Sequence, residues 1–150
     1  MRIGRVFTVD GQSPYNDVEF RKTKSEIRHP DGSIVFAQND IEVPSAWSQV
    51  ACDVLAQKYF RKAGVPCHLR AVKEESVPRW LWRCEADDAA LESVNPAERD
   101  TGESSAKQVF DRLAGTWAYW GWKAGYFDAE SDAHAFYDEC RFMLSRQMCA

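Results

Sequence analysis

One cysteine of the sequence lies directly beside a histidine, the pairing that nucleophilic catalysis by a thiol requires. The neighbours are Cys67 and His68. Adjacent side chains in a loop often point apart, so we favour the alternative interpretation, a packed thiol beside a surface imidazole. The chain contains five cysteines, Cys52, Cys67, Cys84, Cys140 and Cys149. Their odd number and the lack of a CxxC pair predict reduced thiols, with neither a disulfide framework nor a zinc ribbon.

Acidic residues and a histidine near the C-terminus are the closest approach to a metal site. They are Asp132, His134, Asp138 and Glu139. His134 and Asp138 stand four residues apart, a spacing that on a helix more often gives a surface ion pair than two metal ligands. The sequence also lacks a P-loop and a dinucleotide-binding glycine motif. We therefore assign no catalytic, cofactor-binding or metal-binding residue.

Tryptophan is unusually frequent, with six residues in 150. Five of them form two clusters, Trp80-x-Trp82 and Trp117-x-x-Trp120-x-Trp122. These rings could stack on bases of single-stranded nucleic acid, form a core of their own, or dock a partner. Helical spacing in the second cluster favours core or docking. We take Trp117, Trp120 and Trp122 as the candidate docking surface.

Composition describes one globular domain. The chain has 150 residues, 45% of them hydrophobic, and a formal charge of −4, which suits a single core that folds without disulfide or metal. The mild acidity, without a basic block, disfavours duplex DNA. No apolar run is long enough to span a membrane, and the opening residues 1–12 carry charges where a signal peptide needs an apolar stretch. We expect a cytoplasmic protein with no membrane partner.

The first third of the chain has the character of a β-hairpin. Residues 18–28 and 34–43 are rich in strand-forming side chains and flank the turn signal Pro30-Asp31-Gly32-Ser33. An isolated hairpin is marginally stable in water, so this arm should lie on other elements. We therefore predict an arm over residues 1–43 and a helical domain over residues 44–150.

Three main helices are expected in the second part, which makes the fold class α+β and predominantly α. A helix over residues 46–63 would have Ser45 as N-cap and Gly64 as its C′ residue. Prolines interrupt the periodicity between residues 65 and 104, which predicts an irregular connection with at most short helices.

The second and third helices should cover residues 105–122 and 129–148. The second would be capped by Ser104 or Ser105. It would carry an apolar stripe of Phe110, Leu113, Trp117 and Trp120. The third would carry Phe136, Cys140, Met143 and Leu144 on one face. No capping residue follows it, which predicts that this chain is a piece of a longer polypeptide.

Ten short segments, in order, resemble the N-terminal region of adenosylcobalamin-dependent (class II) ribonucleotide reductases. The first five are GQSPY (11–15), EFRK with SEIR (19–28), PDGS (30–33), DIEVP (40–44) and WSQVA (47–51). The second five are LAQKYFRKAG (55–64), VPRWLWR (77–83), FDRLAGTW (110–117), YWGWKAGYF (119–127) and AFYDE with ML-RQM (135–148). They extend over essentially the whole chain.

The resemblance implies a helical segment that precedes the ten-stranded α/β barrel of a reductase that makes 2′-deoxyribonucleotides. In that family adenosylcobalamin generates a thiyl radical on a barrel cysteine, and a cysteine pair supplies electrons. None of the five cysteines here matches a family catalytic cysteine. The resemblance therefore implies that the barrel, the cobalamin site and the nucleotide sites lie outside this chain, on the same polypeptide or on a companion chain.

Two functions from different classes follow. The first is the N-terminal segment of a ribonucleotide reductase, active only with its barrel. The second is a non-catalytic interaction module that uses the same helical fold to bind a protein or single-stranded nucleic acid.

Overall fold

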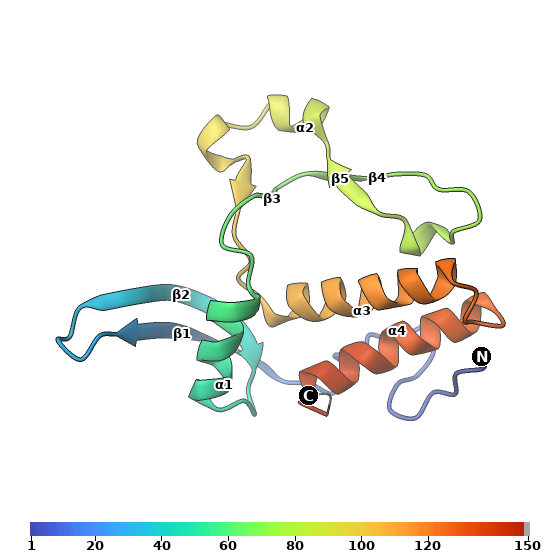
Figure 1. Cartoon of the computed structure of the whole chain (residues 1–150), viewed down its shortest axis with the longest axis horizontal. Coiled ribbons are helices and arrows are strands. Elements are labelled where there is room, and N and C mark those ends of the chain that lie inside the picture. The colour runs from blue at the N-terminus through green and yellow to red at the C-terminus, as the bar shows by residue number, and fades with distance from the viewer. Residues whose placement is uncertain (149–150) are drawn as a thin grey trace.

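The computed structural model describes residues 1–148. It has the predicted α+β fold, an antiparallel hairpin followed by helices (Figure 1). The hairpin pairs β1 (Phe20–Arg28) with β2 (Ile34–Pro44). In the turn between them Gly32 has φ of 87°, a conformation that is available to glycine without a Cβ clash. The predicted hairpin is thus confirmed, with slightly different bounds.

The base of the hairpin belongs to the main hydrophobic core. Ile41 and Val43 are 0% exposed and pack with residues of the first helix and of the long helix α3 (Ala106–Lys123). The Glu42 N–H also donates to the Ser104 carbonyl at 2.8 Å, which joins β2 to the chain that enters α3. The distal part, by contrast, extends away from the helices (Figure 1). As expected, the hairpin lies on other elements, through its base.

The first helix begins later than expected. α1 (Gln49–Val54) starts after Ser48, whose side-chain oxygen accepts a backbone N–H of the first turn. Ser48 is therefore the N-cap, and the prediction of Ser45 is wrong. The reason is a turn closed by the Trp47 N–H and the Pro44 carbonyl at 3.0 Å, which occupies the residues where the helix was expected.

The same helix also ends earlier than expected. α1 continues into one π-helical turn, η1 (Leu55–Tyr59), and Phe60 is already extended. The chain leaves the helix because Phe60 is buried in the core and the Arg61 N–H donates to the Glu103 carboxylate at 2.8 Å. Gly64 has φ of 73°, but it lies in the following loop and is not the C′ residue of a helix.

Residues 65–104 form a small lobe that arches over α3 (Figure 1). Two short antiparallel pairs, which the sequence analysis missed, organise it. They are β3 (Val65–Pro66) with β6 (Asp100–Thr101), and β4 (Leu69–Ala71) with β5 (Cys84–Ala86). Strands of two or three residues are too short to show an alternation in sequence. The short helices are η2 (Arg79–Leu81), α2 (Asp88–Glu92) and η3 (Pro96–Glu98).

Two long helices, α3 (Ala106–Lys123) and α4 (Glu130–Ser145), lie side by side. α3 starts with a capping box in which the Ser105 side chain and the Gln108 side chain satisfy each other's backbone N–H groups. Of the two predicted caps, Ser105 is therefore the correct one. No helix within residues 1–148 has the length and apolar character needed to cross a membrane.

The end of α4 differs from the expectation of an uncapped helix over residues 129–148. The helix stops at Ser145, and Gln147 has φ of 55°. The Gln147 N–H donates to the Leu144 carbonyl at 3.2 Å and the Met148 N–H to the Met143 carbonyl at 2.9 Å. A residue in the left-handed conformation after the last turn is a common helix cap. Gln147 takes that role without being glycine, so the sequence pattern did not reveal it.

The predicted apolar face of α4 is half-buried, and two carboxylates are buried more deeply. Asp138 is 6% exposed and Glu139 is 8% exposed. Residues 1–19 run along α4 and supply their partners, as described below. The apolar pattern did not predict this, because the covering segment binds these two carboxylates through hydrogen bonds.

Candidate docking surface

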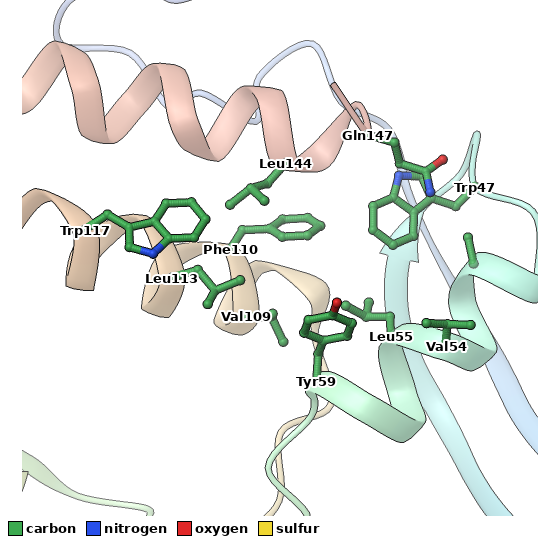
Figure 2. Close-up of a pocket in the computed structure, with 11 residues that line it drawn as sticks. Trp47, Val54, Leu55, Tyr59, Val109, Phe110, Leu113, Trp117, Leu144 and Gln147 are labelled. Atoms are coloured by element: carbon green, nitrogen blue, oxygen red, sulfur yellow. The ribbon is translucent and has the colours of Figure 1, made fainter. Parts of the chain in front are cut away.

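An apolar groove of about 470 Å³ opens where α1 and η1 face α3 and the end of α4 (Figure 2). Aliphatic and aromatic side chains form nearly all of its lining, and Gln147 contributes an amide at one edge. A concave apolar surface with few polar groups is typical of a binding site.

The floor of the groove is continuous with the main core. Val109 and Phe110 come from α3 and are 1% and 2% exposed. They are buried because α3 places apolar residues at spacings of three and four on the side that faces α1 and β2. Trp47 packs on Phe110 with 5.7 Å between ring centroids. Its indole N–H donates to the Ser145 carbonyl at 2.9 Å, which holds the end of α4 against the groove.

The walls of the groove, in contrast, are open to solvent. Val54 of α1 is 48% exposed, Tyr59 of η1 is 53% exposed and Trp117 of α3 is 37% exposed. The three side chains stand around one concavity (Figure 2). Grouped exposed apolar side chains on a folded domain commonly mark an interface.

The three tryptophans of the candidate docking surface occupy different environments. Trp117 forms one end of the groove. Trp120, one turn further along α3, is 62% exposed. Trp122 is half-buried and turns toward the lobe, where its indole N–H donates to the Ser76 carbonyl at 2.6 Å. The docking role of these residues stays a prediction, and the environments favour Trp117 and Trp120 over Trp122 for it.

A second hydrophobic cluster accounts for the other tryptophan pair. Trp80 and Trp82 pack with Trp122 around the buried Val77 and Leu81. The Trp82 indole N–H donates to the Val77 carbonyl at 2.8 Å. These rings join the lobe to α3 and are part of a core.

An ion pair with a buried carboxylate holds the wall that contains Tyr59. The Arg112 guanidinium donates to the Glu103 carboxylate at 3.0 Å and to the Tyr59 carbonyl at 2.8 Å. Burial alone would raise the pKa of Glu103, but hydrogen bonds from Arg112 and from the Arg61 N–H outweigh it and keep the pKa below its usual range. Glu103 therefore stays ionised and fixes η1 relative to α3.

The π-helical turn is itself informative. Single π-turns within helices occur often at functional sites, and here Leu55 and Tyr59 of η1 both line the groove. The Lys62 ammonium donates to the carbonyl of Ala56, a residue of this turn. Sequence reasoning missed the π-turn, since no residue type marks it.

The acidic residues considered as metal ligands serve instead to bind the N-terminal segment. Asp132 accepts the Ile3 N–H at 2.9 Å. Asp138 accepts Arg5 at 2.7 Å and Arg141 at 2.6 Å. His134 packs against Trp80 with 3.9 Å between ring centroids. Within residues 1–148 no group of three metal-ligating side chains comes together.

Glu139 makes the densest of these contacts. It accepts the backbone N–H groups of Val6, Phe7 and Thr8 at 2.9–3.1 Å, and the Thr8 hydroxyl at 2.7 Å. Burial raises the pKa of the carboxyl. The hydrogen bonds from Thr8 and its neighbours lower the pKa by more than burial raises it, so the pKa lies below its usual range.

A carboxyl with a lowered pKa stabilises the fold above its unfolded pKa of about 4.3, and this stabilisation is lost as the pH falls through the folded value. We expect Glu139→Gln to lower the free energy of unfolding by about 1–3 kcal/mol at pH 7. The difference from the wild-type chain should shrink below about pH 4. Thermal melts of both chains between pH 7 and pH 3 measure it. A difference that is constant over this range would contradict the role given to the ionised carboxylate.

The cysteines of the described residues differ in their exposure to solvent. Cys67 and Cys84 are exposed, so the interpretation of Cys67 as a packed thiol is wrong. Cys52 is buried and Cys140 is half-buried on α4. Burial raises the pKa of the Cys52 thiol, which makes it a weaker nucleophile. Cys149 lies outside the described residues.

Comparison with known proteins agrees with the resemblance. A family profile described as class II vitamin B12-dependent ribonucleotide reductase matches residues 21–147. A vitamin B12-dependent ribonucleotide reductase of Bradyrhizobium diazoefficiens is 62% identical over the whole chain, and one of Agrobacterium fabrum is 61% identical. One of Rhodopirellula baltica is 26% identical over 92% of the chain.

The chain spans 12% of the length of each of the first two relatives. The similarity therefore covers one part of a much longer reductase, and it extends over the whole of this chain. The profile match alone covers most of this chain. The chain thus belongs to the class II vitamin B12-dependent ribonucleotide reductases.

Proposed function

We propose that this chain is the N-terminal part of an adenosylcobalamin-dependent reductase that converts ribonucleotides to 2′-deoxyribonucleotides, and that it has no activity without the rest of the enzyme. The observation that carries the proposal is high identity over the whole chain to reductases of which it spans 12%. Its role in the enzyme would be structural, to fold independently and to present its groove to the remaining polypeptide.

The groove does not fit the cofactor. A corrin ring bears many amide side chains that need polar partners, whereas the groove offers aliphatic and aromatic side chains with Gln147 at its edge. When bound, adenosylcobalamin supplies the radical chemistry of the family. We assign that binding to the part of the enzyme outside this chain, and no step of the reaction to residues 1–148.

Interaction with a protein is the second candidate function, and the exposed walls of the groove favour it. Binding of single-stranded nucleic acid would need basic side chains beside the aromatic rings. The groove lining includes Trp47 and Trp117 but neither lysine nor arginine. We therefore prefer a protein partner over nucleic acid at this surface.

Adenosylcobalamin binding tests the proposed division of roles. We expect equilibrium dialysis to show cofactor retained by the full-length reductase and none retained above the dialysis blank by the isolated 150-residue chain. Bovine serum albumin at the same concentration controls for non-specific retention. Saturable binding by the isolated chain would contradict the proposal, and so would the absence of binding by the full-length protein.

The exposed Cys67 offers a separate test. We expect Cys67→Ser to leave the turnover of the full-length enzyme within a few fold of the wild type, because Cys67 is an exposed loop thiol and exposure alone does not make a thiol catalytic. Cys84→Ser, at the other exposed thiol, is the matched control. Complete loss of turnover in a well-folded Cys67→Ser enzyme would show that this thiol takes part in the chemistry.

A further inference from the structure

The groove lies where the chain leaves the described structure. Gln147 lines its edge, and Met148 is the last described residue. In the two reductases that are more than 60% identical, the matched stretch is 12% of the length. Under the proposed function this chain is the N-terminal part of such a longer polypeptide, and the part that continues it leaves the described structure beside the groove, next to Gln147.

The lining restricts the chemistry of an occupant. Leu55, Phe110 and Leu113 offer dispersion contacts and no polar partner. A strand inserted here would bury backbone N–H and carbonyl groups without hydrogen bonds, which is costly. An α-helix satisfies its own backbone and presents only side chains, so an amphipathic helix fits an apolar groove between helices.

A second copy of this chain is a poorer occupant. One set of exposed apolar side chains that could project into a groove is at the hairpin tip, where Ile34 and Val35 are each 54% exposed. Insertion of one molecule's tip into another's groove would join unlike surfaces, and such contacts form open chains unless they close into a ring. Continuation of the same polypeptide has no such requirement.

We propose that the groove formed by α1, η1, α3 and the end of α4 receives an amphipathic helix of the reductase polypeptide beyond residue 150, with apolar side chains at helical spacing seated between Val54, Tyr59 and Trp117. This inference rests on the proposed function, since it takes the occupant from the same enzyme. It assigns Trp117 to the interface and leaves Trp120 outside the groove.

Two valines of α1 give a matched pair of variants for the full-length reductase. Val54 lines the groove and is 48% exposed, whereas Val50, one turn earlier, is 72% exposed and does not line it. A carboxylate buried without a partner is strongly destabilising. We expect Val54→Asp to lower turnover of the full-length enzyme by at least about tenfold. Val50→Asp should stay within about twofold, because a charge at an exposed site costs little. Equal effects of the two variants would overturn the proposal.

Oxidative footprinting of the wild-type enzyme covers the case in which Val54→Asp fails to fold. Labelling of Trp117 and Tyr59 should be several-fold weaker in the full-length reductase than in the isolated 150-residue chain. Tyr126, 59% exposed and away from the groove, serves as an internal reference. Equal labelling of Trp117 and Tyr59 in both proteins would show an open groove and overturn the proposal. Protection in the isolated chain that rises with its concentration would point to a second copy, which also overturns it.

Turnover of the same wild-type sample separates a failure of the helix proposal from a failure of the proposed function. Deoxynucleotide formation together with an open groove would contradict the helix proposal and leave the proposed function standing. No deoxynucleotide formation would contradict the proposed function, whatever the footprint of the groove.

Discussion

Replacing Glu103 with alanine is expected to lower the free energy of unfolding of this chain by about 3 kcal/mol, the lower end of the range for breaking a buried ion pair. Glu103 is 4% exposed and accepts hydrogen bonds from Arg112 at 3.0 Å and from the Arg61 N–H at 2.8 Å. Its removal leaves both donors without this acceptor beside the core. Since Arg112 is itself 27% exposed, water can reach it, which is why we expect the lower end of the range.

The measurement is a thermal melt of the isolated chain at pH 7. A loss of about 3 kcal/mol corresponds to a melting temperature roughly 6–12 °C lower for a domain of this size. Glu98→Ala, at an exposed carboxylate in the lobe, is the matched control and should change the melting temperature little. A Glu103→Ala chain that melts with the wild type would show that the pair does not hold η1 on α3.

Replacing Phe110 with alanine should be the most destabilising change in the aromatic stripe. Phe110 is 2% exposed and contacts Trp47 and Tyr15, with ring centroids 5.7 and 6.4 Å away. Truncation of a buried phenylalanine costs about 3–5 kcal/mol through lost burial and the cavity left behind. Trp120 belongs to the same predicted stripe but is 62% exposed, so Trp120→Ala should change the stability of the isolated chain by less than about 1 kcal/mol.

Urea denaturation of the two variants, compared with the wild-type chain, measures this difference. The stripe contains both a buried and an exposed aromatic residue, and the pair of variants separates core from surface on one helix. A Trp120→Ala chain as unstable as Phe110→Ala would mean that Trp120 is core in solution, contrary to its exposure in the structure. A Phe110→Ala chain as stable as the wild type would mean that Phe110 is not packed into the floor of the groove in solution.

The parts of the fold that depend on local signals could be predicted from the sequence. The hairpin turn was predictable because Asp31 and Gly32 have the chemistry that the turn requires, and Gly32 has a positive φ. α3 was predictable because Ser105, an N-cap residue, precedes a long segment with apolar residues at helical spacing. In these cases the residues that specify an element lie within it.

The parts that depend on distant partners could not be predicted. The first helix ends at Tyr59 because Arg61 bonds to Glu103, forty-two residues away in sequence. The N-terminal segment binds α4 through Glu139 and its neighbours, so the pairing spans nearly the whole chain. A pattern of apolar residues carries no information on such polar, long-range contacts.

The candidate site was predicted only in outline. The excess of tryptophan pointed to α3, and Trp117 does line the groove. The other walls come from Val54 and Tyr59. The apolar periodicity of a helix does not distinguish these two residues from other apolar positions, and the π-turn that contains Tyr59 has no sequence signature. The family assignment followed from the resemblance and from the match over residues 21–147.

Deoxynucleotide formation by the full-length reductase and by the isolated 150-residue chain, assayed side by side, tests the central claim most directly. Each protein is supplied with adenosylcobalamin, a dithiol reductant and the four ribonucleotides, and 2′-deoxyribonucleotides are separated by chromatography. Since the chemistry is assigned to the part of the enzyme outside this chain, we predict product from the full-length enzyme and none above the protein-free background from the isolated chain. Product from the isolated chain above that background would contradict the account.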